Sequence, residues 1–323
     1  MFYYLQKNKI IQSLILLGLV IYTVINLYFS PITYILEENS SYVYRQFVHF
    51  IMLHDIWFYL IFIVNIVLQL ILLHSFFQRN NFTEEKSWMS LIWYLFFLNF
   101  AVDINQITPA FFTNTVIIVL LHLNVNNSPV NLKNKVTLSG MLIALNSLLD
   151  VTSGLLLLFL ITSLLISRFS KFKDVLIAII GFLIPYLYLF SIYFLQDRLL
   201  NFFETYQNIQ LFSLFNSGNF SILHILIASF ALFLMIFLSL IVKINYDNKL
   251  IILRKRVISL ALLLLTTVIM ILFTDIPIKS SLNYLFVPIA LYFSIIHSIK
   301  KHGIANDVMV ILISGTLILL QIL

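Results

Sequence analysis

Two adjacent carboxylates, Glu37 and Glu38, follow the first long apolar run of the sequence and precede a segment rich in aromatic residues. A carboxylate in this position could act as a general base towards an acceptor, or bind a divalent cation beside a phosphate or pyrophosphate. The pair also fits a solvated acidic turn in which Asn39 and Ser40 cap the next helix. Glu37 and Glu38 are the candidate catalytic residues, and both interpretations stay open.

Arg45 and His49 follow on the same segment, four residues apart, so a helix would place them on one face. Two cationic donors on one face could hold a lipid phosphate. The alternative is a pair of side chains that snorkel at a membrane surface, with Arg45 also pairing with a nearby glutamate. We treat both residues as candidate substrate-binding residues.

Asp103 and Asp150 each lie between two short apolar runs. An ionisable group close to a membrane is a functional hypothesis by default, because its burial is costly. Aspartate also suits a tight turn that reaches water. We include both residues, together with Arg198, among the candidate substrate-binding residues.

Metal and nucleotide motifs are absent from the sequence. His49 and His54 are five residues apart, which does not place them side by side on a helix, and there is no HExxH motif and no cysteine. No P-loop, GxGxxG or GxSxG motif occurs. We therefore predict no metal site and no cofactor; a divalent cation comes into question only if the chain is an enzyme.

The composition defines the broad class of protein. Of 323 residues, 61% are hydrophobic, 15% aromatic and only 10% charged, and the mean hydropathy is +1.03. Soluble domains carry about 25% charged residues. The chain is therefore predicted to be an all-α polytopic membrane protein, and its excess of basic residues indicates membrane orientation rather than nucleic-acid binding. Its seven glycines and six prolines suggest that bulky side chains fill the helix contacts.

Eleven apolar stretches are long enough to cross, or nearly cross, a bilayer. They are 10–29, 55–77, 88–102, 108–123, 136–149, 151–167, 175–195, 220–242, 258–273, 284–299 and 305–322.

The distribution of basic residues predicts the orientation. With the N-terminus inside and the C-terminus outside, only Arg45, Arg198 and Lys279 of the 19 basic residues fall in outer segments. A single helix over 136–167 would be about 48 Å long and would reverse every later loop. A hairpin turning near Asp150 avoids both problems, and a second hairpin is expected over 88–123, turning near Asp103.

The chain is read as one domain, 1–323, with two outer loops long enough to have structure. In loop 30–54, Tyr44, Phe47, Phe50 and Ile51 form the apolar stripe of an expected interfacial helix. Loop 196–219 is also expected to contain such a helix. The amides of Asn65, Gln69 and Asn99 are read as inter-helix hydrogen-bonding groups, and Pro185 as a kink.

Part of this layout resembles the C-type fold of glycosyltransferases that use polyprenyl-phosphate sugars. The resemblance covers roughly residues 10–195 and is carried by Glu37-Glu38-x-x-x-Tyr42, by the segment beginning Ile107-Thr-Pro109, and by the segment from Ser139-Gly140 to Asp150. It implies an acidic catalytic pair in the first outer loop, followed by interfacial helices and short hairpins that face outward.

Residues 100–323 also resemble an uncharacterised multi-pass inner-membrane family of Bacteroidota. The resemblance is carried by Gly181-Phe-Leu-Ile-Pro185-Tyr and Tyr284-Leu-Phe-Val-Pro288-Ile-Ala-Leu-Tyr. It implies a location in the bacterial inner membrane and no particular chemistry.

Three functions remain open from the sequence. The first is a glycosyltransferase-like protein that handles a lipid-linked sugar at the outer face for envelope glycan assembly. The second is a non-enzymatic membrane subunit of an envelope assembly, whose partner is another membrane protein. A transporter is disfavoured, because glycine and proline are sparse and no pair of broken helices is evident. Membrane lipids are expected to contact the chain in every case.

Overall fold

Helices account for almost all of the chain that the computed structural model describes, which is residues 8–29, 33–34, 41–52, 55–80, 82, 87–100, 106–124, 131–167, 171–197, 251–274, 278–297 and 315. The elements are α2 (Lys9–Phe29), β1 (Thr33–Tyr34), α3 (Tyr42–Met52), α4 (Asp55–Arg79), α5 (Met89–Phe100), β2 (Gln106–Ile107), α6 (Pro109–Asn124), α7 (Leu132–Leu149), the 3₁₀ helix η1 (Val151–Leu155), α8 (Leu156–Ile166), α9 (Phe172–Leu195), α13 (Ile251–Phe273), α14 (Ile278–Ser281) and α15 (Asn283–His297).

Nine of the eleven predicted apolar stretches coincide with these helices, and 220–242 and, apart from residue 315, 305–322 lie outside the described residues. Three helices begin at least three residues earlier than predicted: α7 includes Lys133 and Lys135, α9 includes Lys173, and α13 includes Arg254. Hydropathy marks only the apolar part of a helix, whereas backbone hydrogen bonds continue into polar residues at its end.

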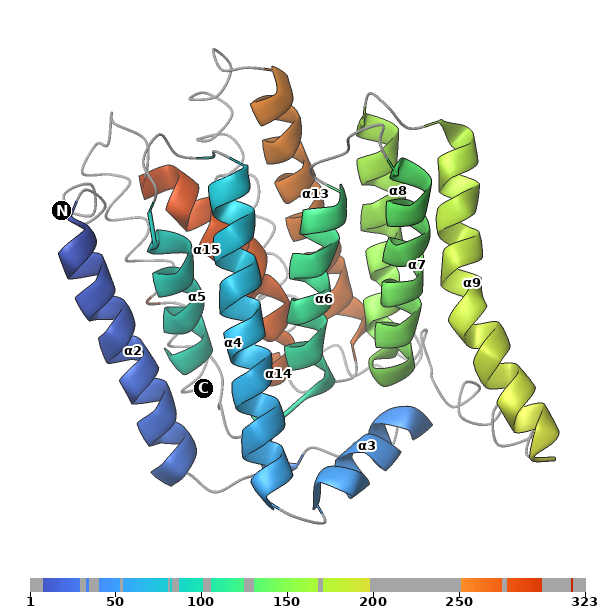
Figure 1. The fold of residues 1–323 in the computed structure, drawn as a ribbon, viewed down its shortest axis with the longest axis horizontal. Coiled ribbons are helices and arrows are strands. Elements are labelled where there is room, and N and C mark those ends of the chain that lie inside the picture. Colours follow the sequence, from blue (N-terminus) through green and yellow to red (C-terminus); the bar gives the residue numbers. More distant parts are fainter. Residues whose placement is uncertain are drawn as a thin grey trace.

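The long helices lie side by side and most consecutive ones run in opposite directions, with α3 lying across one end of the bundle (Figure 1). We call the end where α2, α7, α9 and α13 begin the basic end, because Lys9, Lys133, Lys171 and Arg254 occur there. The opposite end, where α7 finishes and α3 lies, is called the Asp150 end. Helices α9 and α13 run in the same direction (Figure 1).

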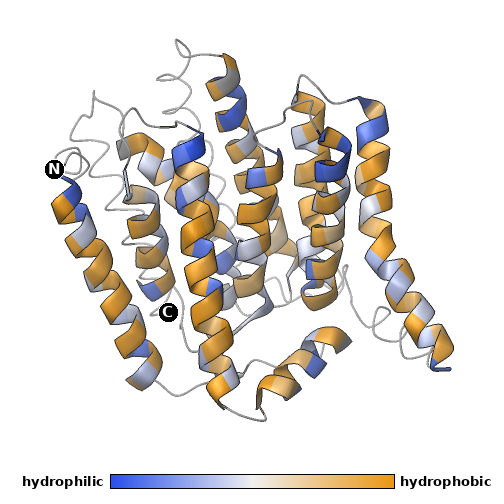
Figure 2. Ribbon diagram, in the orientation of Figure 1, coloured by the Kyte–Doolittle hydropathy of each residue, from blue (hydrophilic) through white to orange (hydrophobic). Residues whose placement is uncertain are grey.

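Four described helices, α2, α4, α9 and α13, are long and apolar enough to cross a membrane. Shorter apolar helices are α5, α6, α15 and the η1–α8 segment. These helices consist mostly of hydrophobic residues, and many of the hydrophilic residues lie near helix ends (Figure 2). The exposed side chains of α2 and α9 are largely apolar. The described chain therefore has the architecture of an all-helical membrane protein.

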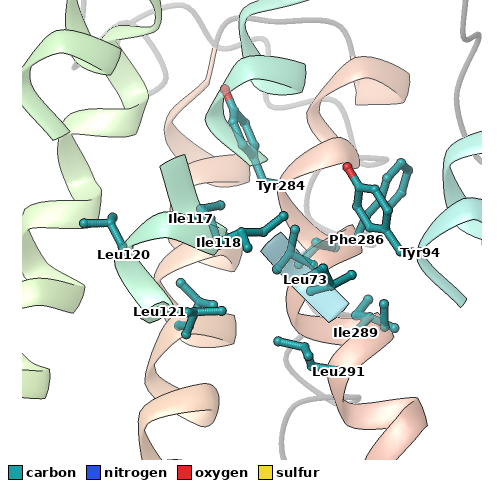
Figure 3. Close-up of a cluster of buried hydrophobic side chains, with 14 of the residues drawn as sticks. Leu73, Tyr94, Ile117, Ile118, Leu120, Leu121, Tyr284, Phe286, Ile289 and Leu291 are labelled. Atoms are coloured by element: carbon teal, nitrogen blue, oxygen red, sulfur yellow. The ribbon is translucent and has the colours of Figure 1, made fainter. Parts of the chain in front are cut away.

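The core is centred on α15, which packs against α5, α6 and α13. Apolar side chains of α4, α6 and α15 meet there, among them Leu73, Ile117 and Ile289 (Figure 3). α15 is also the common neighbour of α5 and α6, the two arms of the hairpin expected over 88–123. Pro288 lies inside α15.

The closest helix contact involves glycine. α7 and α9 cross where Gly140 faces the backbone carbonyl of Ala178, and a Cβ placed on Gly181 would lie 2.6 Å from the Thr137 carbonyl oxygen. Neither glycine can therefore be replaced without moving the helices apart. The expectation that bulky side chains fill the helix contacts is wrong at this crossing. Pro185 lies within α9, and the helix changes direction along its length (Figure 1).

Buried amides connect helices, as the sequence predicts. Gln69 on α4 donates to Thr115 Oγ1 of α6 at 2.9 Å and accepts from the Tyr94 hydroxyl of α5 at 2.6 Å. Asn99 of α5 donates to Thr23 of α2 at 3.0 Å. Such bonds fix helix pairs together where no water competes for the polar groups.

The basic end is held by cationic side chains on helix-end carbonyls. At the start of α13, Lys255 Nζ donates to the Ile166 carbonyl at the end of α8 (3.0 Å), and Arg256 Nη1 donates to the Asn80 carbonyl after α4 (2.6 Å). Cations are favourable at helix C-termini because the last carbonyls carry partial negative charge. Two residues of this basic run therefore join three helices.

Candidate functional site at Asp150

Asp150 stands at the turn between α7 and η1. Its extended backbone (φ −133°, ψ 100°) ends α7, and its N–H still donates to the Asn146 carbonyl at 2.8 Å. The chain then reverses through η1 into α8, which packs against α7. The predicted hairpin over 136–167 is therefore confirmed. The sequence also allowed a tip that reaches water, but the Asp150 side chain is only 4% exposed.

Three hydroxyl groups surround the Asp150 carboxylate. Oδ2 accepts hydrogen bonds from Tyr284 of α15 at 2.6 Å and from Thr113 of α6 at 2.9 Å, and Oδ1 accepts one from Thr152 of η1 at 2.6 Å. A carboxylate accepts at both oxygens, so each donor is matched to a lone pair. One buried side chain thus joins the ends of α6, α7, η1 and α15.

A second layer orients these donors. Asn146 Nδ2 donates to Thr113 Oγ1 at 2.8 Å, and the single Thr113 proton lies within reach of Asp150 Oδ2 at 2.9 Å and of the Pro109 carbonyl at 3.2 Å. The Ser153 hydroxyl donates to the Asp150 backbone carbonyl at 2.7 Å. Hydrogen bonds therefore hold both the side chain and the backbone carbonyl of Asp150.

The hydroxyl groups that donate to the Asp150 carboxylate within the described part of the chain are all neutral. Burial raises the pKa of the Asp150 carboxyl above its usual value, and the hydrogen bonds from Thr152, Tyr284 and Thr113 oppose that rise. A carboxylate held by hydroxyl groups can exist ionised away from water, but it has no lone pair directed at an open surface. The geometry suits a residue that positions helix ends rather than one that meets a substrate.

Ser41 connects this cluster to the first loop. Its hydroxyl donates to the Leu148 carbonyl at 2.6 Å, with the Leu149 carbonyl also near at 3.1 Å, and its oxygen accepts from the Tyr44 N–H at 3.1 Å. Ser41 is thus the N-cap of α3, one residue after the cap expected from the sequence, and it also satisfies the end of α7.

A short parallel strand pair makes a second connection. Thr33 of β1 pairs with Gln106 of β2, and Tyr34 pairs with Ile107. β2 directly precedes α6, so this pair attaches the chain after α2 to the start of the helix that carries Thr113. Tyr34 and Ser41 therefore both lie at the Asp150 end of the bundle.

The expected helix in loop 30–54 is confirmed as α3, which spans Tyr42–Met52. Tyr44, Val48 and Ile51 are buried against the bundle, whereas Arg45, His49 and Phe50 are exposed. Arg45 and His49 thus share one exposed face, as their spacing predicts. The apolar stripe expected from Tyr44, Phe47, Phe50 and Ile51 is divided, because Phe50 faces away from the buried side.

The other candidate residues, Glu37, Glu38, Asp103 and Arg198, lie outside the described residues, as does most of loop 196–219. Within the described part, no three histidine, cysteine or acidic side chains gather to bind a metal ion. The structure therefore brings together Asp150 with its hydroxyl partners, and separately Arg45 with His49.

The hydroxyl partners Thr113, Thr152 and Tyr284, and the connecting residue Ser41, were not predicted. A carboxylate between two apolar runs implies donors somewhere nearby, because it cannot stay buried alone. The sequence does not say which helices supply them. Tyr284 is 134 positions away from Asp150, and only the packing of α15 against α6 joins the two.

No family model, curated protein or solved structure matches the chain closely enough to indicate a relationship.

Proposed function

We propose that the protein resides in the bacterial inner membrane, crosses it about eleven times, and handles a lipid-linked sugar at the outer face for envelope glycan assembly. In this proposal the basic end is cytoplasmic and the Asp150 end faces outward. Among the described residues, Lys133, Lys171 and Arg254 lie at the basic end, which agrees with the positive-inside rule.

One observation carries the proposal: the loop that contains Glu37 and Glu38 is attached on both sides to the helix ends around Asp150. Tyr34 is held by β2, and Ser41 by the end of α7. Three residues of chain span at most about 11 Å, and each glutamate is three residues from one of these anchors. The same limit applies to Asp103, which precedes Gln106 by three residues. Chain connectivity thus supports a convergence of carboxylates at one outward site.

The residues have distinct proposed roles. Glu37 or Glu38 takes the proton of the acceptor hydroxyl as the bond from the sugar anomeric carbon to the donor phosphate breaks. Arg45 and His49, exposed together on α3, bind the phosphate, with Arg198 as a further cation. Asp150 positions the helix ends and, through Ser41, the start of α3.

The surroundings of α3 suit a membrane interface. Phe50 and Trp57 are exposed, with ring centroids 5.8 Å apart. Exposed aromatic side chains beside cationic ones are typical of the headgroup level. A lipid-borne phosphate would therefore reach Arg45 and His49 from the bilayer itself.

A donor-turnover assay tests the proposal. The purified protein, reconstituted in liposomes with a polyprenyl-phosphate hexose labelled in the sugar, is expected to release the sugar slowly to water in place of an acceptor. The Glu37→Gln/Glu38→Gln double variant should lose roughly 100-fold or more of this activity, as for removal of a general base. Arg45→Gln should instead weaken donor binding.

Asp197→Asn is the matched control, because Asp197 is an exposed carboxylate at the same end of the bundle and asparagine tolerates its positive φ of 55°. It should leave turnover and binding unchanged. Parent-level turnover in the double glutamate variant would refute the catalytic assignment.

A second function, a non-enzymatic subunit of an envelope assembly, is favoured by one observation. Both oxygens of Asp150 already accept hydrogen bonds within the protein, as a purely structural carboxylate would. Cross-linking in intact membranes followed by extraction in mild detergent would then recover a defined complex with another membrane protein. Recovery of the monomer alone would count against it.

A further inference from the structure

Exposed tryptophans lie at two levels along α4. Trp57 belongs to the first turn of the helix and is 40% exposed. Trp88, which is 38% exposed, lies beside His74 near the other end of the helix, with ring centroids 5.8 Å apart. Tryptophan is enriched at both interfaces between a membrane and water. Between the two levels, every exposed side chain of α4 is aliphatic: Leu60, Ile63, Val64, Val67, Leu68 and Ile71.

The spacing of the two levels gives the thickness of this aliphatic surface. Trp57 and His74 are seventeen residues apart on one helix, which corresponds to about 26 Å at about 1.5 Å per residue. A typical bilayer has a hydrocarbon core of about 30 Å. The core helices α6 and α15 are shorter still, with 16 and 15 residues. The described helices therefore fit a bilayer that is thinner than usual.

A ring contact relates the level of Asp150 to that of Trp57. Helices α4 and α6 run in the same direction (Figure 1), and Phe62 of α4 stacks on Phe111 of α6 with ring centroids 4.7 Å apart. Thr113, two residues further along α6, is therefore about seven helical residues, or about 10 Å, inside the level of Trp57. The Thr113 hydroxyl is 2.9 Å from Asp150 Oδ2. Asp150 thus lies about 10 Å further inside the molecule than the tryptophan.

Other aromatic residues also lie further out than the Asp150 turn. α2 ends in Tyr28 and Phe29, whose side chains are 77% and 78% exposed. The end of α2 and the beginning of α4 both extend beyond the end of α7 (Figure 1). Phe50 of α3 is exposed beside Trp57, with ring centroids 5.8 Å apart. Exposed aromatic side chains on three helices therefore mark one outer level.

We propose that the bilayer meets the protein at the levels of Trp57 and Trp88, so that its hydrocarbon core along α4 is about 26 Å thick and the Asp150 turn lies within the outer leaflet. At this depth polar groups need partners within the protein. The contacts agree, because three hydroxyl groups donate to the Asp150 carboxylate and Ser41 donates to the last carbonyls of α7. The inference rests on the membrane location in the proposed function and not on the sugar chemistry, so it can fail while the catalytic assignment holds.

Spin labels on single cysteines measure the depth directly, since the chain has no cysteine of its own. The relative access of oxygen and of a water-soluble nickel chelate to each label reports its depth in reconstituted vesicles. Labels at Ile56→Cys and Ile71→Cys should be shallow, and a label at Val64→Cys should lie near the bilayer centre. A Val64→Cys label that neither reagent reaches would overturn the proposal, because another protein rather than lipid would then cover α4.

The same measurement beside Asp150 tests the position of the turn. Leu149→Cys, at a half-buried position, should be about as deep as Val64→Cys. Val151→Cys, half-buried on the other side of the turn, gives a second value if the first variant does not fold. Labels as shallow as that at Ile56→Cys would overturn the placement of Asp150 within the outer leaflet.

Thermal unfolding in vesicles tests the thickness independently of any label. The vesicles consist of phosphatidylcholines that differ only in the length of their monounsaturated chains. The melting temperature should be higher with palmitoleoyl than with erucoyl chains, because a thicker bilayer must be compressed to match the short aliphatic surface. Equal melting temperatures, or a higher one with erucoyl chains, would overturn the proposed thickness. Neither measurement reads sugar turnover, so the result does not depend on catalysis.

Discussion

The two ends of the bundle satisfy the same backbone groups with opposite chemistry. At the basic end, Lys255 and Arg256 donate to the carbonyls that finish α8 and α4. At the Asp150 end, the neutral hydroxyl of Ser41 donates to the carbonyls that finish α7. Every helix leaves its last carbonyls without partners, so both ends need donors; among these described contacts the basic end uses charged donors and the Asp150 end a neutral one.

The difference follows from the charged groups that lie beside these donors at each end. A cation at the Asp150 end would pair with the buried carboxylate and draw it away from Thr113, Thr152 and Tyr284. Neutral donors leave the carboxylate as the only charge in the cluster. At the basic end the buried carboxylate of Asp174 accepts a hydrogen bond from the Lys171 backbone N–H at 2.7 Å, and Lys255 and Arg256 are only partly buried. We therefore expect the stability contributed by the Asp150 end to depend on pH, and that contributed by the basic end to depend on salt concentration.

Replacing Asp150 should have the largest effect. Asp150→Ala leaves the hydroxyls of Tyr284, Thr113 and Thr152 without their acceptor, and should cost about 3–5 kcal/mol, as for breaking a buried charged partner. Thermal unfolding of the purified protein in detergent measures it. Asp197→Asn, at the same end but exposed, should change nothing. Equal melting temperatures for Asp150→Ala and the parent would show that the cluster does not hold the helix ends.

Tyr284→Phe should have the next largest effect, about 1.5–3 kcal/mol for one hydrogen bond to a charged group. The lost donor favoured the ionised carboxylate, so the pKa of Asp150 rises further. The destabilisation should accordingly be greatest at high pH and shrink as the pH falls below the pKa of Asp150. Melting temperatures of the parent and of Tyr284→Phe across a pH series test this pH dependence. A destabilisation that grows towards acid pH would contradict the prediction.

The α7–α9 crossing sharpens the comparison, because it lies between the two ends. Gly140→Ala places a methyl group against the Ala178 carbonyl and should cost about 1–3 kcal/mol through overpacking. Gly18→Ala is the matched control, since nothing lies within 4 Å of its added Cβ, and it should be neutral or slightly stabilising. If the two variants unfold at the same temperature, α7 and α9 can move apart to accept the methyl group without a loss of stability.

Removing a cation from the basic end should have the smallest effect. Arg256→Gln removes a cation from the end of α4 and should cost about 0.3–2 kcal/mol at low ionic strength. Its cost should decrease with added salt, unlike that of Asp150→Ala. Arg254→Gln, an exposed neighbour in the same run, is the control. If the loss of stability in Arg256→Gln did not depend on salt, the proposed contrast between a salt-sensitive basic end and a pH-sensitive Asp150 end would be wrong.

The sequence predicts the helices and the Asp150 hairpin well because both depend on local pattern. Apolar length defines a span, and the positions of basic residues exclude a single helix over 136–167. The amide contacts of Gln69 and Asn99 are also predictable in kind, since a buried amide must find a partner. Which partner it finds depends on helix neighbours, so Tyr94, Thr115 and Thr23 could not be named in advance.

The same limit explains why composition did not reveal the α7–α9 crossing and why the exposure of Asp150 stayed open. Two glycines among seven suffice for the α7–α9 crossing, because only the residues at the point of closest approach need to be small; overall glycine content does not reveal them. Asp150 lies at a hairpin tip as predicted, but its exposure depends on α15, a helix that begins 133 positions later in the chain. Local sequence carries no information about that neighbour.

Ser41 makes two helices depend on one side chain. If α3 separates from the bundle, the hydroxyl that starts α3 leaves the carbonyls that finish α7, and both helices lose hydrogen bonds in the same event. The amides at the beginning of α3 and those around the Asp150 turn should therefore exchange with deuterium as a single cooperative unit. A movement of the first loop would in this way be communicated to the hairpin without any rearrangement of the helices between them.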